Sequence, residues 1–145
     1  MERVKVFLPE KFAFSTTIKI RITDLNYGGH VGNDAFLSLI HEARQQFLMH
    51  HGCTELNFFG VGLIMADAAI EFKKELSYSD EVIISVAADG FTKYGFDLLY
   101  KMEVVTNEQT LIAGKAKTGM LCFDYTNKKL ALLPAEAVKK LNTSE

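Results

Sequence analysis

The chain has 145 residues, of which 48% are hydrophobic and 23% are charged, and its formal net charge is −2. This length and composition are typical of one globular domain, so we expect residues 1–145 to fold as a single domain. The near-neutral charge gives no electrostatic basis for nucleic acid binding, and no run of about 18 apolar residues would span a membrane. The first twelve residues lack the apolar core of a signal peptide, which predicts a soluble cytoplasmic protein.

The first expected elements are a strand and a long helix. Residues 16–22 alternate between apolar and polar, which predicts a strand whose isoleucines, the last of them Ile22, share the buried face. A Gly-rich turn follows. Apolar residues then recur at helical spacing, which predicts a helix from about Asn33 to His51 that stops at Gly52.

Four further alternating segments predict four strands. They begin near Ile64, Val82, Tyr94 and Thr110, and the last ends near Phe123. In the first of these strands, Ile64 and Ile70 should share one face. Short turns join the strands, so the sheet should be antiparallel. A proline then opens a short C-terminal helix. Several strands are apolar on both faces and one helix cannot cover both, so we expect the protein to oligomerise.

Cysteine and histidine usage argues against a metal site. Cys53 and Cys122 are the only cysteines and lie far apart in the chain. We expect two buried free thiols. The four histidines lack carboxylate or thiol partners at ligand spacing, so the sequence predicts no bound metal.

The turn between the first strand and the long helix carries most of the chemistry. Residues 24–34 read Asp-Leu-Asn-Tyr-Gly-Gly-His-Val-Gly-Asn-Asp. They combine two adjacent glycines with amide, imidazole and carboxylate groups at the start of a helix. A helix entrance exposes backbone N–H groups that can hold a carbonyl oxygen or an anion. The turn is therefore the first candidate for a functional site.

This turn and the order of the elements resemble the hotdog-fold thioesterases, especially the 4-hydroxybenzoyl-CoA thioesterase-like group. The family's run Asp-x-Asp-x-x-Gly-His-Val-Asn-Asn is similar to residues 24–33, and its Glu-x-Ala-Arg-like helix segment to residues 41–44. Residues 70–82 resemble its Phe-x-x-Pro-Leu-x-x-Gly-Asp-x-Val strand–turn–strand. Residues 122–134 resemble its last strand and closing proline. The likeness extends from about Ile18 to Pro134.

The resemblance implies an α+β hotdog fold, with an antiparallel sheet wrapped around one long central helix and a short C-terminal helix. It implies a homodimer, often paired again into a homotetramer, with active sites built from both chains at the dimer interface. The acyl group would enter an apolar slot, and a coenzyme A or acyl-carrier-protein arm would approach from the surface. No cofactor is expected beyond the coenzyme A part of the substrate.

Thioester hydrolysis needs a polarised carbonyl and an attacking water. The family's oxyanion donor corresponds to the backbone N–H of Asn33, with Gly32 allowing close approach, although Asn33 is also a good helix-capping residue. Asn26 stands where the closest group has an aspartate that acts as nucleophile or base. An amide can only hydrogen-bond water or the carbonyl. Asn26 therefore positions the reacting groups, as an asparagine does in other hotdog thioesterases, or it only stabilises the turn.

The base must then come from another residue. His41 has the position of the helix carboxylate of related enzymes, and it has the ordinary chemistry of a base at neutral pH. Glu42 is next to it, but neighbours on a helix point about 100° apart, so the two are not expected to serve one carbonyl. Glu42 could instead be solvated and paired with a nearby glutamine. His30 falls where the plant-type acyl-carrier-protein thioesterases place a histidine, or it only bonds the local backbone.

Substrate contacts are expected at a second turn. The family often places them at the turn that here contains Thr92 and Lys93, although a lysine in a turn is commonly just solvated. The sequence as a whole predicts an acyl-CoA or acyl-carrier-protein thioesterase that uses water attack. The alternative is a non-catalytic acyl-thioester-binding hotdog protein that has lost the catalytic aspartate.

Overall fold

The computed structural model describes residues 1–142. In chain order the elements are β1 (Phe14–Lys19), the 3₁₀ helix η1 (Ile22–Asp24), α1 (Asn33–His50), β2 (Gly62–Phe72), β3 (Glu81–Asp89), β4 (Gly95–Thr106), β5 (Gln109–Asp124), β6 (Lys129–Leu130) and α2 (Ala135–Leu141).

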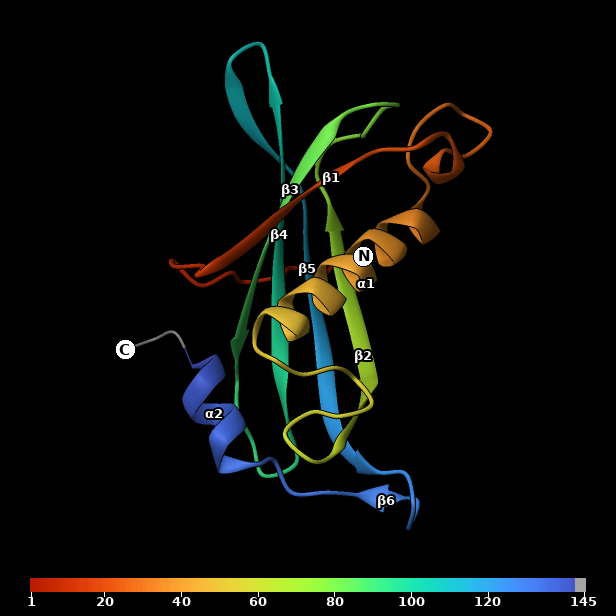
Figure 1. The fold of residues 1–145 in the computed structure, drawn as a ribbon. Helices are drawn as coiled ribbons and strands as arrows, with labels where there is room; N and C mark the ends of the chain where they lie inside the picture. Colours follow the sequence, from red (N-terminus) through yellow and green to blue (C-terminus); the bar gives the residue numbers. More distant parts are fainter. Residues whose placement is uncertain (143–145) are drawn as a thin grey trace.

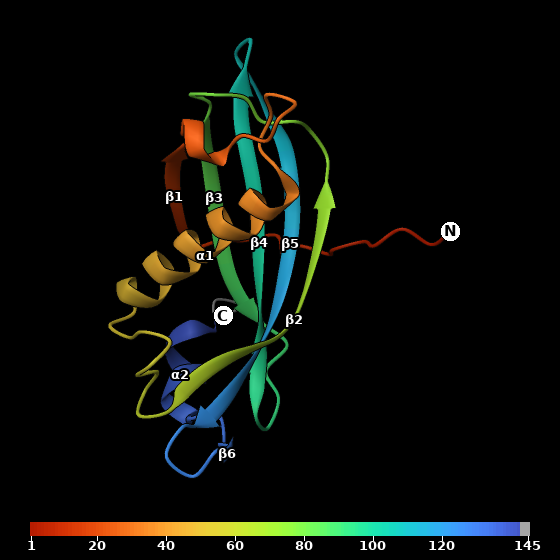
Figure 2. The same cartoon turned by 90° about the vertical axis from the view of Figure 1, so that its right-hand side faces the viewer.

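The strands form one antiparallel sheet in the order β1-β3-β4-β5-β2, and the short β6 pairs with β5. Helix α1 crosses one face of this sheet, and the N-terminal segment crosses behind it (Figures 1 and 2). The order leaves β1 and β2 as the two edges. This is the antiparallel sheet around one long helix, with a short C-terminal helix, that the sequence predicts.

Alternating apolar residues build the core between α1 and the sheet. Phe36, Leu39, Ile40, Ala43 and Phe47 of α1 are buried at helical spacing. They face strand residues that recur at every second position, because successive side chains of a strand point to opposite faces. The residues of β3 and β4 in this core are Val82, Ile84, Val86 and Ala88 of β3 and Phe96, Leu98, Tyr100, Met102 and Val104 of β4.

The prediction for Ile22 was wrong. The first strand ends at Lys19, and Ile22 lies in η1 with 69% of its side chain exposed. Asp24 closes this turn, because its carboxylate accepts hydrogen bonds from the Arg21 N–H at 2.8 Å and from Arg21 Nη2 at 3.2 Å. Local capping of this kind ends the alternation that the isoleucines suggested.

The prediction that Ile64 and Ile70 share a face was also wrong. The pairing of β2 with β5 shifts between Met65 and Asp67, and the extra residue reverses the alternation. Leu63 is therefore buried in the core in place of Ile64. Asp67 holds the bulge, since its Oδ1 accepts hydrogen bonds from the N–H of Gly119 at 2.9 Å and from Lys117 Nζ at 2.8 Å.

The N-terminal segment partly covers the face of the sheet opposite α1. Val6 is buried there, and its N–H donates to the carboxylate of Glu71 in β2. The ring of Phe12 lies under Lys101, with Nζ 5.1 Å from the ring centroid. Figure 2 shows the first residues extending away from the sheet. This cover explains why Leu99, on that face of β4, is buried.

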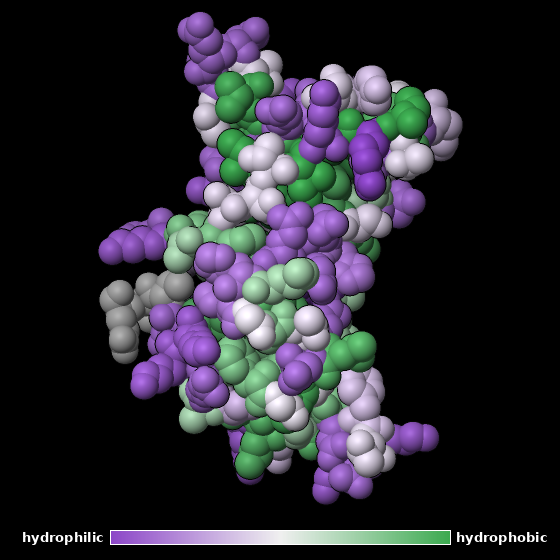
Figure 3. Space-filling view, in the orientation of Figure 1, coloured by the Kyte–Doolittle hydropathy of each residue, from purple (hydrophilic) through white to green (hydrophobic). Residues whose placement is uncertain are grey.

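Two groups of exposed apolar side chains lie on the sheet. In Figure 3 they are visible on the β4–β5 hairpin below its polar tip, where Val105, Leu111 and Ile112 are exposed. At the β2 edge, Met65 and Phe72 are 48% and 49% exposed. A long edge strand with open backbone groups is a template for pairing with another chain.

Candidate active site

Asn26 holds the turn that precedes α1. Its N–H donates to the carbonyl of His30 at 2.8 Å, and its side-chain Oδ1 accepts hydrogen bonds from the N–H of Gly28 at 2.8 Å and of His30 at 3.5 Å. Gly29, at φ +80°, supplies the left-handed residue of the turn. Asn26 is exposed, and its amide nitrogen has no hydrogen-bond partner among residues 1–142. The side chain stabilises the turn and still has a donor to offer.

The entrance of α1 lies directly beside Asn26. Gly32 is the N-cap residue, and no side chain caps the helix there. A Cβ on Gly32 would lie 2.5 Å from Oδ1 of Asp34 and 3.6 Å from Cβ of Asn26. Because Gly32 has no side chain, the first amides of α1, that of Asn33 included, can be approached closely. Asn33 itself is exposed, and its side-chain oxygen accepts the Asp34 N–H at 3.0 Å.

His30 faces away from the helix entrance, toward the β2–β3 turn. Its Nε2 lies 3.3 Å from Oε2 of Glu75, and 42% of its side chain is exposed. The backbone around it is tied to the same turn, since the Val31 N–H donates to the Leu76 carbonyl at 2.9 Å. The carboxylate of Glu75 beside His30 therefore belongs to the β2–β3 turn, whereas Asn26 belongs to the turn before α1.

A small pocket opens between α1 and the end of β2. It has a volume of about 220 Å³ and is lined by Val31, Phe36, Phe72, Lys73, Lys74 and Glu75. Its floor is apolar, with the rings of Phe36 and Phe72 packed edge to face at 5.0 Å. Its rim is charged. Such a pocket can take an apolar group inside and leave a charged arm in solvent.

His41 and Glu42 lie further along α1. His41 is eight positions after Asn33, which is about 12 Å along the helix axis. His41 is 64% exposed, and Glu42 accepts a hydrogen bond from Gln46 Nε2 at 3.2 Å. His41 therefore does not meet a carbonyl held at Asn33 of the same chain.

Thr92 and Lys93 lie at the other end of the sheet from Asn26. Strand β3 starts opposite Lys19 and reaches Asp89 after eight residue steps, about 26 Å at the usual rise of a strand. The Thr92 hydroxyl donates to the Gly95 carbonyl at 3.2 Å, and Lys93 Nζ lies 5.3 Å from the ring centroid of Tyr94. One chain alone does not unite the predicted substrate contacts with the helix entrance.

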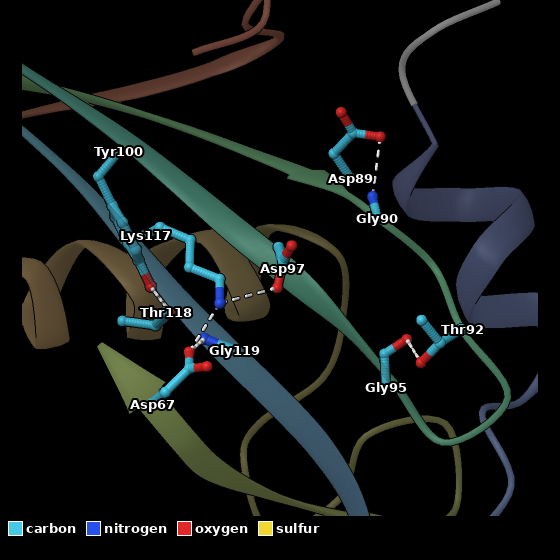
Figure 4. A network of polar contacts seen from close by, with 10 residues as sticks. All are labelled: Asp67, Asp89, Gly90, Thr92, Gly95, Asp97, Tyr100, Lys117, Thr118 and Gly119. Carbon is cyan, nitrogen blue, oxygen red and sulfur yellow. Dashed lines mark hydrogen bonds and ion pairs between the residues drawn. The ribbon is translucent and has the colours of Figure 1, made fainter. Parts of the chain in front are cut away.

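Thr92 instead lines a groove on the sheet face opposite α1. The groove has a volume of about 220 Å³ and reaches β2 at Ala66 and Asp67. Figure 4 shows Lys117 between two carboxylates, with Nζ 2.8 Å from Asp67 Oδ1 and 3.5 Å from Asp97 Oδ1. The hydrogen bond between Lys117 and Asp67 raises the pKa of the lysine and lowers the pKa of the carboxyl. The positive charge of Lys117 is thus balanced by two carboxylates, which makes Lys117 a poor phosphate ligand.

A buried polar network that the sequence reasoning missed lies between α1 and the sheet. Arg44, 6% exposed, donates from Nε to Glu55 Oε1 at 2.8 Å and from Nη1 to the Tyr100 hydroxyl at 3.3 Å. Tyr100 shares a 2.8 Å hydrogen bond with Thr118. Burial alone would lower the pKa of Arg44, but Tyr100 and Glu55 raise it.

The signal for this network was present in the sequence. Arg44 falls midway between Ile40 and Leu48, four residues from each, so it lies in the apolar stripe of the helix. A charged residue in that stripe needs a buried partner.

The cysteines are buried and free, as predicted. Burial raises the pKa of Cys122 to about 11, so its thiolate is scarce at neutral pH. Within residues 1–142, no three His, Cys, Asp or Glu side chains gather as metal ligands. No helix in the same range is long and apolar enough to cross a membrane.

Solved structures define the class of the fold. One similar structure is a 4-hydroxybenzoyl-CoA thioesterase variant that has asparagine in place of an aspartate and 4-hydroxybenzoyl-CoA bound. It superposes with a TM-score of 0.78 at 15% sequence identity, and the match covers 88% of this chain and 97% of that chain. A 1,4-dihydroxy-2-naphthoyl-CoA thioesterase from Synechocystis gives a TM-score of 0.74 at 18% identity, covering 91% and 98%. The hotdog fold is confirmed.

The sequence itself places the chain within this class. Residues 20–141 match the profile of the thioesterase-like superfamily, and the chain belongs to that superfamily. The 1,4-dihydroxy-2-naphthoyl-CoA hydrolase of Rippkaea orientalis is 27% identical over 132 residues, which cover 89% of this chain and 95% of the relative. These named relatives are thioester hydrolases.

Proposed function

We propose that the protein is a cytoplasmic acyl-CoA thioesterase that works as a homodimer and prefers a compact, aromatic acyl group. The relatives named above act on 1,4-dihydroxy-2-naphthoyl-CoA or bind 4-hydroxybenzoyl-CoA. The small apolar pocket beside α1 agrees with an acyl group of that size. Two buried free cysteines agree with a reducing compartment.

One observation carries this proposal: the helix entrance at Gly32 has no side-chain cap and has Asn26 beside it. The thioester oxygen would accept the Asn33 N–H at the positive end of α1. A donor fixed there strengthens its bond as negative charge grows on the oxygen. The unused amide nitrogen of Asn26 would donate to the attacking water or to the carbonyl.

The dimer is proposed from the exposed edge of β2. If two β2 strands pair antiparallel about a two-fold axis, every edge N–H and C=O finds a partner. The ends of the two sheets then lie next to each other in opposite order. His41, Thr92 and Lys93 of one copy thereby come toward Asn33 of the other. A second pairing into a homotetramer would leave these sites intact.

His41 of the second copy is the proposed base. Of the other candidates, Glu42 is bonded to Gln46, and His30 is paired with Glu75 away from the helix entrance. His41 would take a proton from water as the water oxygen bonds to the carbonyl carbon and the C=O electron pair moves to oxygen. When the intermediate collapses, the C–S bond breaks and the same proton passes to sulfur. The products are the free acid and coenzyme A.

A substrate panel tests this proposal. Wild type and the His41→Ala variant would be assayed with benzoyl-, hydroxybenzoyl- and naphthoyl-CoA, with straight-chain acyl-CoA, and with acyl-carrier-protein thioesters. We expect wild type to hydrolyse the aromatic coenzyme A esters best and H41A to lose at least about 100-fold in kcat. Turnover of the carrier-protein esters alone, or full activity in H41A, would contradict the assignment.

One observation favours a second function, binding of an acyl thioester without turnover. Asn26 stands where the related group has its reactive aspartate, and the similar structure with bound 4-hydroxybenzoyl-CoA also has asparagine in place of an aspartate. Tight binding of aromatic coenzyme A esters by wild type, with no release of free thiol over hours, would support this second function.

A further inference from the structure

A continuous run of polar contacts leads from the core to the exposed side chain of His41. It starts at Thr118 on β5, passes through the Tyr100 hydroxyl to the guanidinium of Arg44, and reaches Glu55 Oε1. The same carboxylate oxygen lies 3.6 Å from Nε2 of His41. The imidazole is therefore the solvent-exposed end of a network whose other members lie largely inside the protein.

Glu55 is held more firmly than a surface carboxylate. Its side chain is 29% exposed and is bonded to the buried Arg44. Its backbone carbonyl accepts the Leu63 N–H at 2.7 Å, which ties the loop after α1 to the start of β2. A carboxylate fixed at both backbone and side chain can orient a neighbouring ring, because little freedom remains to be lost.

From this geometry we infer that Glu55 is a positioning residue, which holds His41 by Nε2 and leaves Nδ1 free to take the proton from water. The inference rests on the proposed function, in which His41 is the base. Glu55 would not touch the substrate. It would orient the ring and stabilise the imidazolium that forms when the proton of water moves to Nδ1. The proton then passes from Nδ1 to the thiolate, so the proposed step transfers no proton to Glu55.

A second histidine–glutamate pair in the chain offers a matched comparison. His30 Nε2 is 3.3 Å from Glu75 Oε2, but Glu75 is 76% exposed, and among residues 1–142 no buried arginine holds it. Two long exposed side chains in one ion pair contribute little, since solvent screens them and their order costs entropy. The anchoring by Arg44 distinguishes Glu55 from Glu75.

A double-mutant cycle in the full-length protein tests the inference. Glu55→Gln would be made in wild type and in the His41→Ala background. The control is Glu136→Gln on α2, where the carboxylate is 64% exposed and lies 3.5 Å from Lys140 Nζ. The glutamine oxygen still accepts the Arg44 hydrogen bond, so E55Q should fold. We expect E55Q to lower kcat by about 10- to 100-fold with KM little changed, and to have no further effect once His41 is absent. E136Q should leave kcat within about twofold of wild type.

An equal loss from E55Q in both backgrounds would overturn the inference, because Glu55 would then act through Arg44 and the fold.

A readout without activity separates this result from failure of the proposed function. In ¹⁵N-labelled protein, the ring Nε2–H signal of His41 should be protected from exchange in wild type and E136Q but not in E55Q. If H41A is fully active while that protection is seen, the base assignment is wrong and the pairing stands. If no protection is seen in wild type, the pairing is wrong.

Discussion

Replacing Gly32 with alanine should remove activity while leaving the fold almost unchanged. The backbone of Gly32 has φ −71° and ψ 159°, which alanine adopts without strain. Alanine is a poorer N-cap than glycine by up to about 1 kcal/mol. It also restricts the unfolded chain, which returns about 0.4–1 kcal/mol. The net change in unfolding free energy should be within about 1 kcal/mol, or about 4 °C in Tm.

The effect on catalysis should be far larger. The new Cβ would lie 2.5 Å from Asp34 Oδ1, at the approach to the first amides of α1. If the thioester oxygen cannot reach its N–H donor, kcat of the variant should fall about 100- to 1,000-fold. The assay is release of free thiol from an aromatic coenzyme A ester, with Tm measured on the same samples.

A control separates blocked access from displacement of Asp34. Gly32→Ala combined with Asp34→Ala removes the close contact with the carboxylate but keeps the new methyl group. We expect this double variant to remain as inactive as G32A. Wild-type activity in G32A itself would refute the role of the helix entrance as the oxyanion site.

Three other predictions concern stability, assembly and pH. Asn26→Ala should cost about 1–2 kcal/mol of stability, because two backbone N–H groups lose their acceptor, and should also lower kcat about tenfold or more; a loss of stability alone, by thermal melts and kinetics, would mean that Asn26 only holds the turn. Met65→Lys at the β2 edge should give an inactive monomer in sedimentation velocity; an active dimer would disprove the pairing through β2. The pKa of His51 is lowered from 6.5 by burial, and further by His50 and Lys140, so the unfolded state binds this proton more readily. Stability should therefore fall as the pH drops below about 6.5, and less so in His51→Gln; equal Tm losses in both proteins between pH 7.5 and 5.5 would argue against it.

The fold was largely predictable because its signals are local and periodic. Helix α1 and strands β3 and β4 follow alternating or helical patterns with few exceptions. The errors arose where one residue breaks the period. A bulge reversed the faces of β2 before Asp67, and capping by Asp24 ended β1 early. Neither event changes the hydrophobic pattern enough to be read in advance.

The candidate site was less predictable, for a different reason. The turn at Asn26 and the entrance at Gly32 are adjacent in sequence, so their proximity follows from the helix start. Glu55 comes from a loop eleven residues beyond Arg44, and Tyr100 comes from a central strand. Their meeting is set by tertiary packing, which a linear pattern does not encode. Contacts between two copies of the chain are even harder to predict from the linear pattern, because they depend on the folded surface of each copy.

Subunit complementation tests the shared site most directly. The variants Gly32→Ala and His41→Ala, each inactive alone, would be mixed and allowed to exchange subunits. If the helix entrance of one chain works with His41 of the other, half of the dimers become mixed and each mixed dimer has one intact site. The account predicts recovery of about one quarter of wild-type activity. No recovery after exchange, verified by mass spectrometry of the mixed dimer, would contradict it.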